Sequence, residues 1–467
     1  MRHVKTAFIL GLILVTLLMP AFSVVVQAEP EDKLVLIGPV YTQEAEAVIR
    51  GFKEYYKRTY GKDIEVTYLK PGGWPVCVDK VRAWGGKPEA DVFFGGGPPA
   101  YEALKAEGLL EKYVPKSADN LPEKAFGTYI KDPEGYWYAF SLWFVSNIYN
   151  AKVLKKLKLD PPKTWDDLLK KEYRGYIVHT LPYASGTMHE TVEILLQTRG
   201  WNATWAYFRR LAVNLARFST GSTDTLLIVE RGEAPIGVAQ PQMNAMMAQA
   251  DGYPVVCIIP EVTLLVAEGV ALLKNAPHPE VAKIFMDWIL TEEGQKYVLE
   301  GGYFPAIKDF YFSKYEDEIP MAKYAKAAIG VDNFYEIKGV TAIPYDIKLA
   351  GERWDLVNEY FEKEIYRKWD ELKATWLLIE EVQGELDVLK AKGVDVSEAE
   401  KKLEEAIVLF DSGKLAEARL LALEARTPTP AAPPTTERPP YELYTGIIVA
   451  IAVVIAAVLY YKAKTTK

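Results

Sequence analysis

The chain has 467 residues, with 63 Asp and Glu against 55 Lys and Arg, which gives a formal net charge of −8 at pH 7. A surface of that sign repels nucleic acid, and no basic stripe interrupts it, so nucleic acid is excluded as a partner. The two cysteines, Cys77 and Cys257, are far apart in sequence; an oxidising compartment would permit a disulfide between them, and two free buried thiols fit equally well.

The N-terminus has the three regions of a secretory signal peptide. Arg2 and Lys5 precede an apolar run over residues 7–19, and Val26-Gln27-Ala28 provides the cleavage site. The alternative is a first transmembrane helix, but the run is short and ends at Pro20. We expect a signal peptide over residues 1–28, whose removal leaves 63 acidic against 53 basic residues and no cysteine near the new terminus for a lipid anchor.

The body that follows alternates short apolar runs with helical patterns. Residues 34–37, 64–69 and 91–94 are typical of buried strands, and between the first two the apolar residues recur at helical spacing at Ala45, Val48, Ile49, Phe52 and Tyr56. Strands that alternate with helices predict an α/β fold, with a mostly parallel sheet covered on both faces. The body is too long for a single core, so we expect two lobes.

The stretch ADVFFGGGPPAYEALKAEGLL, residues 90–110, places three glycines and two prolines at the end of a strand. A phosphate-binding loop would need Gly-Lys-Ser/Thr, and a dinucleotide site would need G-x-G-x-x-G opening a helix; neither is present. The prolines also remove two amide donors. We therefore reject a nucleotide site and expect Gly96 and Gly97 to let another ligand approach the backbone closely.

Two long apolar segments bound a second lobe. Residues 136–149 are typical of a buried strand pair, and residues 254–273 of a further strand region. The segment between them has its own strand and helix pattern. The simplest arrangement places residues 33–150 and 254–368 in the first lobe and inserts residues 151–253 as the second. The two connections between the lobes would form a hinge.

Several loops place hydroxyls, glycines or aromatic residues where a strand ends and a helix begins. Helix N-termini with such residues offer free amides and a favourable dipole to an anion. Plain N-capping explains each loop taken alone, but their recurrence in both lobes favours a ligand-binding cleft. The residues that we expect to line it are Tyr41, Trp74, Gly96, Gly97, Ser185, Gly186, Thr187, Ser222 and Thr223.

The C-terminal region predicts a stalk and a membrane anchor. Apolar residues at spacings of three and four over 369–426 indicate a helical hairpin, with a break near Gly393. Residues 427–442, rich in Pro and Thr, form a semi-rigid linker. Residues 443–461 are uncharged and long enough to cross a bilayer, and the lysines that follow place the tail in the cytoplasm and the body outside.

Catalytic patterns are weak, and we expect no metal and no cofactor. His179 and His189 flank the Ser185 loop, so a Ser/His pair is conceivable, but there is no G-x-S-x-G motif and no H-E-x-x-H motif. No nucleophile is assembled with a base and an orienting acid. A secreted hydrolase and a purely adhesive surface protein remain the alternatives from other classes.

The body over residues 33–368 resembles the extracellular solute-binding proteins of ABC importers, in the branch of ferric-iron, phosphonate and thiamine binders. Five segments carry this resemblance, in family order: residues 90–110, PPKTWDDLLKKEYRGYI at 161–177, the SGT loop at Ser185, STGSTDTLLIVERGEAPIGVA at 219–239, and PHPEVAKIFMDWILTEEGQKYV at 277–298. The resemblance implies a type II periplasmic-binding-protein fold of two α/β lobes that close on a solute and dock to a membrane permease. The C-terminal anchor resembles that of archaeal members.

One position departs from the iron-binding members, which have adjacent tyrosines just after the segment equivalent to residues 234–239. Here the sequence is Gln240-Pro241-Gln242-Met243-Asn244. Ferric iron prefers phenolate and carboxylate oxygen, and neutral amides are poor substitutes. We therefore expect Gln240 and Asn244 to form hydrogen bonds with an organic or oxyanionic solute, with a phosphonate or phosphate ester favoured over the alternatives of ferric iron and thiamine. No enzymatic activity is expected.

Overall fold

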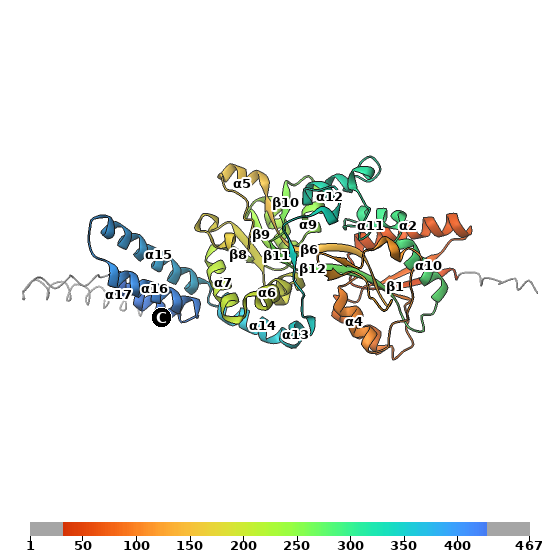
Figure 1. Cartoon of the computed structure of the whole chain (residues 1–467), viewed down its shortest axis with the longest axis horizontal. Helices are drawn as coiled ribbons and strands as arrows, with labels where there is room; N and C mark the ends of the chain where they lie inside the picture. The colour runs from red at the N-terminus through yellow and green to blue at the C-terminus, as the bar shows by residue number, and fades with distance from the viewer. Residues whose placement is uncertain (1–30, 427–467) are drawn as a thin grey trace, which may run out of the picture. The chain divides into compact units, whose positions relative to one another are not determined.

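A computed structural model describes residues 31–426 (Figure 1). The signal peptide expected over 1–28, the linker over 427–442 and the membrane helix over 443–461 lie outside these residues. Within residues 31–426, none of the helices combines the length and the apolar character needed to cross a membrane. The described chain forms two compact units, one of residues 31–376 with 411–413, the other of residues 377–410 with 414–426.

The first unit is built on one long sheet, of order β2-β1-β3-β12-β6-β9-β7-β8, with β10 also paired to β6. Its first half contains β1 (Lys33–Ile37), β2 (Glu65–Leu69), β3 (Val92–Phe94) and β12 (Leu265–Leu272). β1 pairs in parallel with β2 and β3, whereas β12 is antiparallel to β3 and to the beginning of β6 (Tyr138–Asn150). The strands and the mixed α/β class predicted for this half are confirmed.

Both faces of this half are covered by helices, which explains why residues 34–37 of β1 are all apolar. Leu34 and Leu36 belong to one buried cluster, and Val35 and Ile37 to another, because successive side chains point to opposite faces. One face carries α2 (Thr42–Tyr60), α10 (Pro279–Ile289) and α11 (Glu292–Glu300); the other carries α3 (Trp74–Ala83) and α4 (Pro98–Ala106). In α2 the predicted apolar positions are buried, apart from the half-buried Ile49.

The second half of the sheet uses the end of β6. Residues 145–149 of β6 pair with β9 and residues 147–150 with β10. We expected residues 136–149 to form a strand pair, but residues 138–149 are part of a single strand shared by both halves. The other elements of this half are β7 (Ile177–Thr180), β8 (Leu215–Ser219), β9 (Ile236–Pro241), β10 (Val255–Ile258), α5 (Ala151–Leu157), α6 (Gly186–Arg199), α7 (Trp201–Asn214), α8 (Ser222–Arg231) and α9 (Met243–Ala250).

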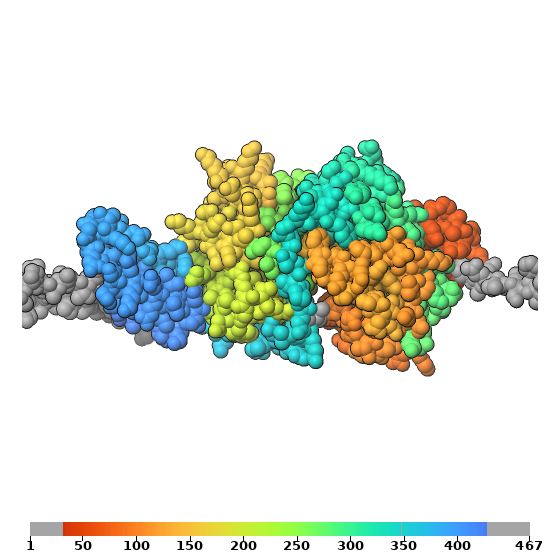
Figure 2. Space-filling model, viewed as in Figure 1, coloured from red at the N-terminus to blue at the C-terminus, as the bar shows by residue number. Residues whose placement is uncertain are grey.

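Part of residues 254–368, which we assigned to the first lobe, packs against the second half. β10 pairs with β6 there, and α12 (Met321–Ile329) contacts α9 and β10. The chain then follows the boundary between the halves, where β13 (Thr341–Ala342) pairs with β11 (Val262–Thr263), and continues into α13 (Ile347–Glu352) and α14 (Trp354–Phe361). Figure 2 shows this segment, in cyan, running down the face of the unit.

Short elements complete the unit. They are the hairpin of β4 (Lys124–Ala125) and β5 (Thr128–Tyr129), 3-10 turns at Ala118–Asn120, Asp166–Leu169, Lys171–Tyr173, Pro182–Ala184, Phe312–Tyr315 and Phe334–Glu336, and a π-helical turn at Glu362–Tyr366.

The C-terminal region has three helices rather than the expected hairpin: α15 (Trp369–Ala391), α16 (Ser397–Asp411) and α17 (Leu415–Arg426). The predicted break near Gly393 is present. A second break occurs at Gly413, whose φ of 83° is a left-handed conformation that favours glycine. In the smaller unit, Arg426 of α17 pairs with Glu381 and Glu385 of α15, which fixes the last helix against the first.

The disulfide that the sequence permitted is not formed. Cys77 and Cys257 are both free and buried. Cys77 belongs to the cluster under α3 and α4 in the first half, whereas Cys257 lies in β10 of the second half and donates to the carbonyl of Ala328 at 2.7 Å. The two thiols are held in separate cores, so they act as small apolar side chains.

Candidate functional site

A cavity of about 1380 Å³ opens between the two halves of the larger unit. Nine of the ten residues expected to bind a ligand line it. From the first half come Tyr41 before α2, Trp74 at the start of α3, and Gly96 and Gly97 before α4. From the second half come Ser185, Gly186, Thr187, Ser222 and Thr223.

The chain directly after β3 packs closely against neighbouring residues and has left-handed backbone angles, so it requires glycine at positions 95 and 96. Gly95 has φ 91°, and a Cβ there would lie 2.2 Å from Cγ2 of Val40. Gly96 has φ 83°. The carbonyl of Gly95 accepts a hydrogen bond from the buried Tyr101 hydroxyl at 2.8 Å. Gly96 and Gly97 therefore bring bare backbone to the cavity wall.

Two helix N-termini meet at the cavity. β7 and β8 are parallel neighbours, with Thr180 opposite Ser219, so α6 and α8 begin at the same edge of the sheet. Ser185 Oγ lies 2.6 Å from Ser222 Oγ, and it also caps α6 by accepting from the backbone N–H of Met188 at 3.3 Å. The first amides of both helices, which have no partner within their helix, are thus gathered in one place.

The acid in the first turn of α8 is engaged locally. Asp224 Oδ2 accepts from the backbone N–H of Thr220 at 2.9 Å and from its hydroxyl at 3.0 Å. These hydrogen bonds lower the pKa of Asp224, with the backbone N–H as the first cause. The carboxylate therefore fixes the loop before α8.

Gln240 does not line the cavity, and its predicted role as a ligand is wrong in this structure. Its side chain is 0% exposed. Nε2 donates to the carbonyl of Ala239 at 3.2 Å, and Oε1 accepts from Nδ2 of Asn244 at 2.9 Å. The amide is used within the fold, and its neighbours Pro241 and Met243 reach the cavity instead.

Three functional candidates were missed in the sequence: Trp143 in β6, Glu268 in β12 and Tyr303 after α11. Glu268 is 8% exposed, and its Oε1 accepts from Nε1 of Trp143 at 3.0 Å. Burial raises the pKa of Glu268 to about 7, although the Trp143 hydrogen bond acts in the opposite direction. An acid in the otherwise apolar run Val266-Ala267-Glu268-Gly269-Val270 was the signal that could have found this site.

Two further carboxyls share this environment. Glu190 in α6 is half-buried and lines the cavity; burial and the charge of Glu268 raise its pKa to about 8. Glu44 in α2 is 0% exposed, and neither of its carboxyl oxygens has a hydrogen-bond partner. Burial, with Glu268 as the second cause, raises the pKa of Glu44 well above its ordinary value. A cluster of acids that hold their protons unusually tightly therefore surrounds Glu268.

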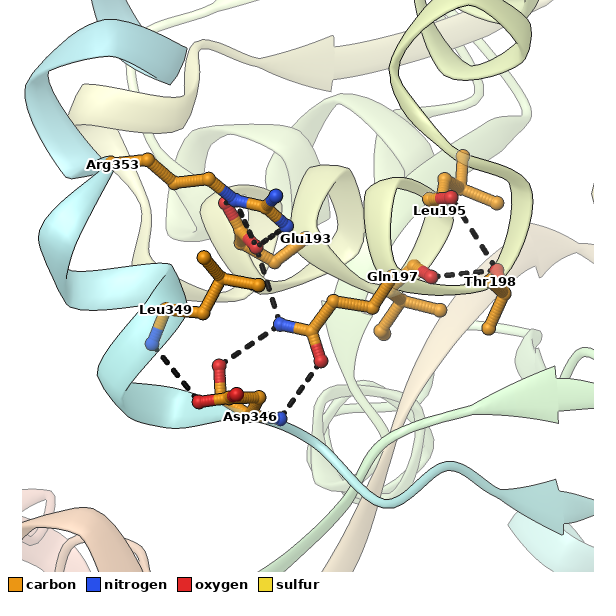
Figure 3. Close-up of polar contacts among 8 residues, drawn as sticks. Glu193, Leu195, Gln197, Thr198, Asp346, Leu349 and Arg353 are labelled. Atoms are coloured by element: carbon orange, nitrogen blue, oxygen red, sulfur yellow. Dashed lines mark hydrogen bonds and ion pairs between the residues drawn. The ribbon is translucent and has the colours of Figure 1, made fainter.

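Residues 346–353, which begin at the cavity, are held to α6 by hydrogen bonds and an ion pair (Figure 3). Asp346 lines the cavity, and its backbone exchanges two hydrogen bonds with the side chain of Gln197. Arg353 reaches Glu193, with Nε 2.8 Å from Oε1 and 3.0 Å from Oε2. Glu193 is 0% exposed, so this ion pair lies inside the protein. The same helix thus presents its N-terminus to the cavity and its middle to residues 346–353.

The chemistry of the lining is unfavourable to catalysis by histidine. His179 and His189 are buried outside the lining, and burial lowers the pKa of each to about 4. His189 stacks on Trp354, with ring centroids 3.7 Å apart. Within the described part of the chain, no three His, Cys, Asp or Glu side chains are grouped as metal ligands would be.

Residues 87–333, more than half of the chain, match the family described as bacterial extracellular solute-binding protein. The chain belongs to this family. This solute-binding protein is similar to the phosphoglycerate transport regulatory protein PgtC of Salmonella typhimurium, with 24% identity over 287 residues that make up 59% of this chain and 66% of that one.

Two solved structures share the fold. Periplasmic binding protein AfuA from Actinobacillus pleuropneumoniae, solved with fructose-6-phosphate bound, has a TM-score of 0.53 and 22% identity, and the match covers 71% of this chain and 98% of that one. Iron-bound HitA from Pseudomonas aeruginosa has a TM-score of 0.55 and 21% identity, with 70% and 99% covered. The periplasmic-binding-protein-like fold is confirmed. The ligands of these neighbours differ, so they do not assign one to this protein.

Proposed function

We propose that this solute-binding protein captures a small anionic solute, a phosphonate or a phosphate ester, and delivers it to an ABC import permease without chemical change. The observation that carries this proposal is the 2.6 Å contact between Ser185 and Ser222, which brings the starts of α6 and α8 together at the cavity.

Such a site binds an anion without a basic side chain. The amides at the start of a helix and the helix dipole both favour negative charge. The hydroxyls of Thr187, Ser222 and Thr223 add donors beside them. The phosphoglycerate transport regulatory protein PgtC and AfuA with bound fructose-6-phosphate support an ester of phosphate as the solute class. Tyr41, Trp74 and the glycines at 96–97 would contact the solute from the other half.

Two substitutions test the donors. Thr187→Val and Ser222→Ala each remove one hydroxyl beside the proposed anion, and each should weaken binding about tenfold or more, because a hydrogen bond to a charged group contributes about 1.5–3 kcal/mol. Titration calorimetry with 3-phosphoglycerate, fructose 6-phosphate and methylphosphonate would measure the loss.

The matched control is Thr198→Val, at the other end of α6. Its hydroxyl donates to the carbonyl of Ile194 at 2.7 Å and lies outside the cavity lining, so the affinity should not change. Binding of neutral sugars, with no binding of any anion, would refute the anionic solute.

We also propose that the body is tethered to the outer face of a membrane. This rests on the sequence, since residues 427–442 form a Pro/Thr-rich linker and residues 443–461 an uncharged run of bilayer length. Deleting residues 441–467 should release the body into the medium, as fractionation and immunoblotting would show. A truncated protein that still sediments with membranes would contradict the C-terminal anchor.

A further inference from the structure

The charge of the cavity is unbalanced. Among the described residues that line it there is no Lys, Arg or His, while five carboxyls do so: Glu102, Glu190, Asp224, Glu268 and Asp346. The helix N-termini account for one anionic group of a solute, and Lys105 lies 3.8 Å from Glu102, but no ion pair among the described residues involves Glu190 or Glu268. An anionic group beside these two acids would favour their protonated form, whereas a positive group would favour their ionised form.

Glu268 is the most deeply buried of these five acids. It is more than nine-tenths buried and lines the cavity, and its Oε2 has no hydrogen-bond partner. Leaving a buried polar atom unpaired costs free energy, so an unpaired carboxyl oxygen facing a ligand cavity indicates a group that the ligand itself provides.

The surroundings of Glu268 suit a cation. Trp143 donates to it, and Tyr41 and Tyr303 are close enough for its charge to raise the pKa of both hydroxyls, although burial is the larger cause. The rings of Tyr41 and Tyr303 have centroids 6.0 Å apart at an interplanar angle of 60°. All three aromatic residues line the cavity, and aromatic faces beside a carboxylate are the usual environment for ammonium groups.

Other charged groups lie near Glu268. From the second half, Glu190 of α6 is close enough to Glu268 for the two charges to interact. In the first half, Glu44 of α2 is also close enough to Glu268 for the two charges to interact, and neither of its carboxyl oxygens has a hydrogen-bond partner. One basic group is nearby: Nζ of Lys70 lies 5.5 Å from the Tyr41 centroid, but Lys70 does not line the cavity. An ammonium group at Glu268 would therefore lie between acids from both halves and draw them together.

We propose that the solute is zwitterionic: a phosphate ester or phosphonate whose other end is an amine or a quaternary ammonium, with Glu268, Trp143 and Tyr303 forming the subsite for the cation. This rests on the proposed function for its anionic end. A sugar hydroxyl could also bind a carboxylate, but only a positive group would stabilise the ionised form of the buried Glu268.

The experiment compares solutes that differ only in charge. Choline phosphate and its longer-chain homologues are titrated into the protein beside the isosteres in which tert-butyl replaces trimethylammonium, and beside choline. The best-binding ammonium compound should bind about tenfold or more tightly than its isostere, because a buried charged contact contributes at least that factor.

Substitution then locates the cation. Glu268→Gln keeps an acceptor for Trp143 and removes the charge, so it should reduce the preference for ammonium over its isostere about tenfold. Glu172→Gln is the charge-matched control, since Glu172 is exposed and outside the cavity lining. The preference is a ratio of two affinities on one variant, so loss of folded protein would not imitate this effect.

The outcomes separate the two proposals. Equal binding of ammonium phosphates and their isosteres would overturn the cationic subsite and leave the anionic site intact. If choline binds and no phosphate-containing compound does, the anionic site is refuted. If neither these compounds nor the phosphate esters and phosphonate of the earlier titration bind, both proposals are refuted. An ammonium preference that survives in Glu268→Gln would overturn the assignment to Glu268.

Discussion

Replacing Arg353 by alanine is expected to lower the free energy of unfolding by about 3–5 kcal/mol, because it leaves a buried carboxylate without its partner. Glu193 is 0% exposed, and Arg353 binds both of its oxygens through Nε. Gln197 contributes one further bond, at 3.3 Å, which cannot neutralise the charge. Urea unfolding followed by tryptophan fluorescence would measure the loss.

Arg199, which lies on α6 itself, provides the control. Arg199 pairs with Asp166 at 2.6 Å, but the side chain of Asp166 is 65% exposed, so Arg199→Ala should cost no more than about 1 kcal/mol. The double variant Glu193→Gln with Arg353→Leu should recover much of the loss, since it removes both charges. If Arg353→Ala proves no more costly than Arg199→Ala, residues 346–353 are not held to α6 as described.

Replacing Glu268 by glutamine should stabilise the unliganded protein at high pH. Burial raises the pKa of Glu268 from about 4.5 to about 7, so the folded state binds the proton more tightly than the unfolded state. The stability associated with the protonated carboxyl is complete below pH 4.5 and is lost as the pH rises through 7. At about 1.4 kcal/mol per unit of pKa, the variant should gain about 2–3 kcal/mol over the wild type between pH 5 and pH 8.

Thermal and urea unfolding at a series of pH values would show this gain as a difference between variant and wild type that grows with pH. Glu172→Gln should show no such growth, because Glu172 is exposed. A constant difference between pH 5 and pH 8 would mean that Glu268 is already ionised at pH 5 in the folded protein.

Local patterns predicted the elements well. The spacing of Ala45, Val48, Phe52 and Tyr56 predicted α2, and the serine and threonine loops predicted where α6 and α8 begin. Their convergence was also predictable, because parallel neighbouring strands end at the same edge of a sheet. These features depend on residues close together in sequence, where periodicity and capping decide the outcome.

Features set by distant contacts were not predicted. Gln240 follows a strand like the other site residues, but its amide is satisfied by Ala239 and Asn244, which no local pattern reveals. Glu268 lies in a strand whose apolar character concealed it. The attachment of residues 346–353 to α6 depends on an ion pair between residues far apart in sequence, and the sequence gives no sign of which lobe such a segment will join.

Strand β6 belongs to both halves of the sheet, so it links the folding of the first half to that of the second. The first half of the sheet needs β12 beside β6, and β7, β8, β9 and β10 of the second half all precede β12 in the chain. The second half in turn buries Glu193, whose partner Arg353 is made 160 residues later. The first half can therefore be completed only after the strands of the second half are made, and the second half only after Arg353 is made; such long-range pairing slows folding. A chain that stays incomplete until its last third is synthesised suits export in an unfolded form, which is the route that residues 1–28 predict.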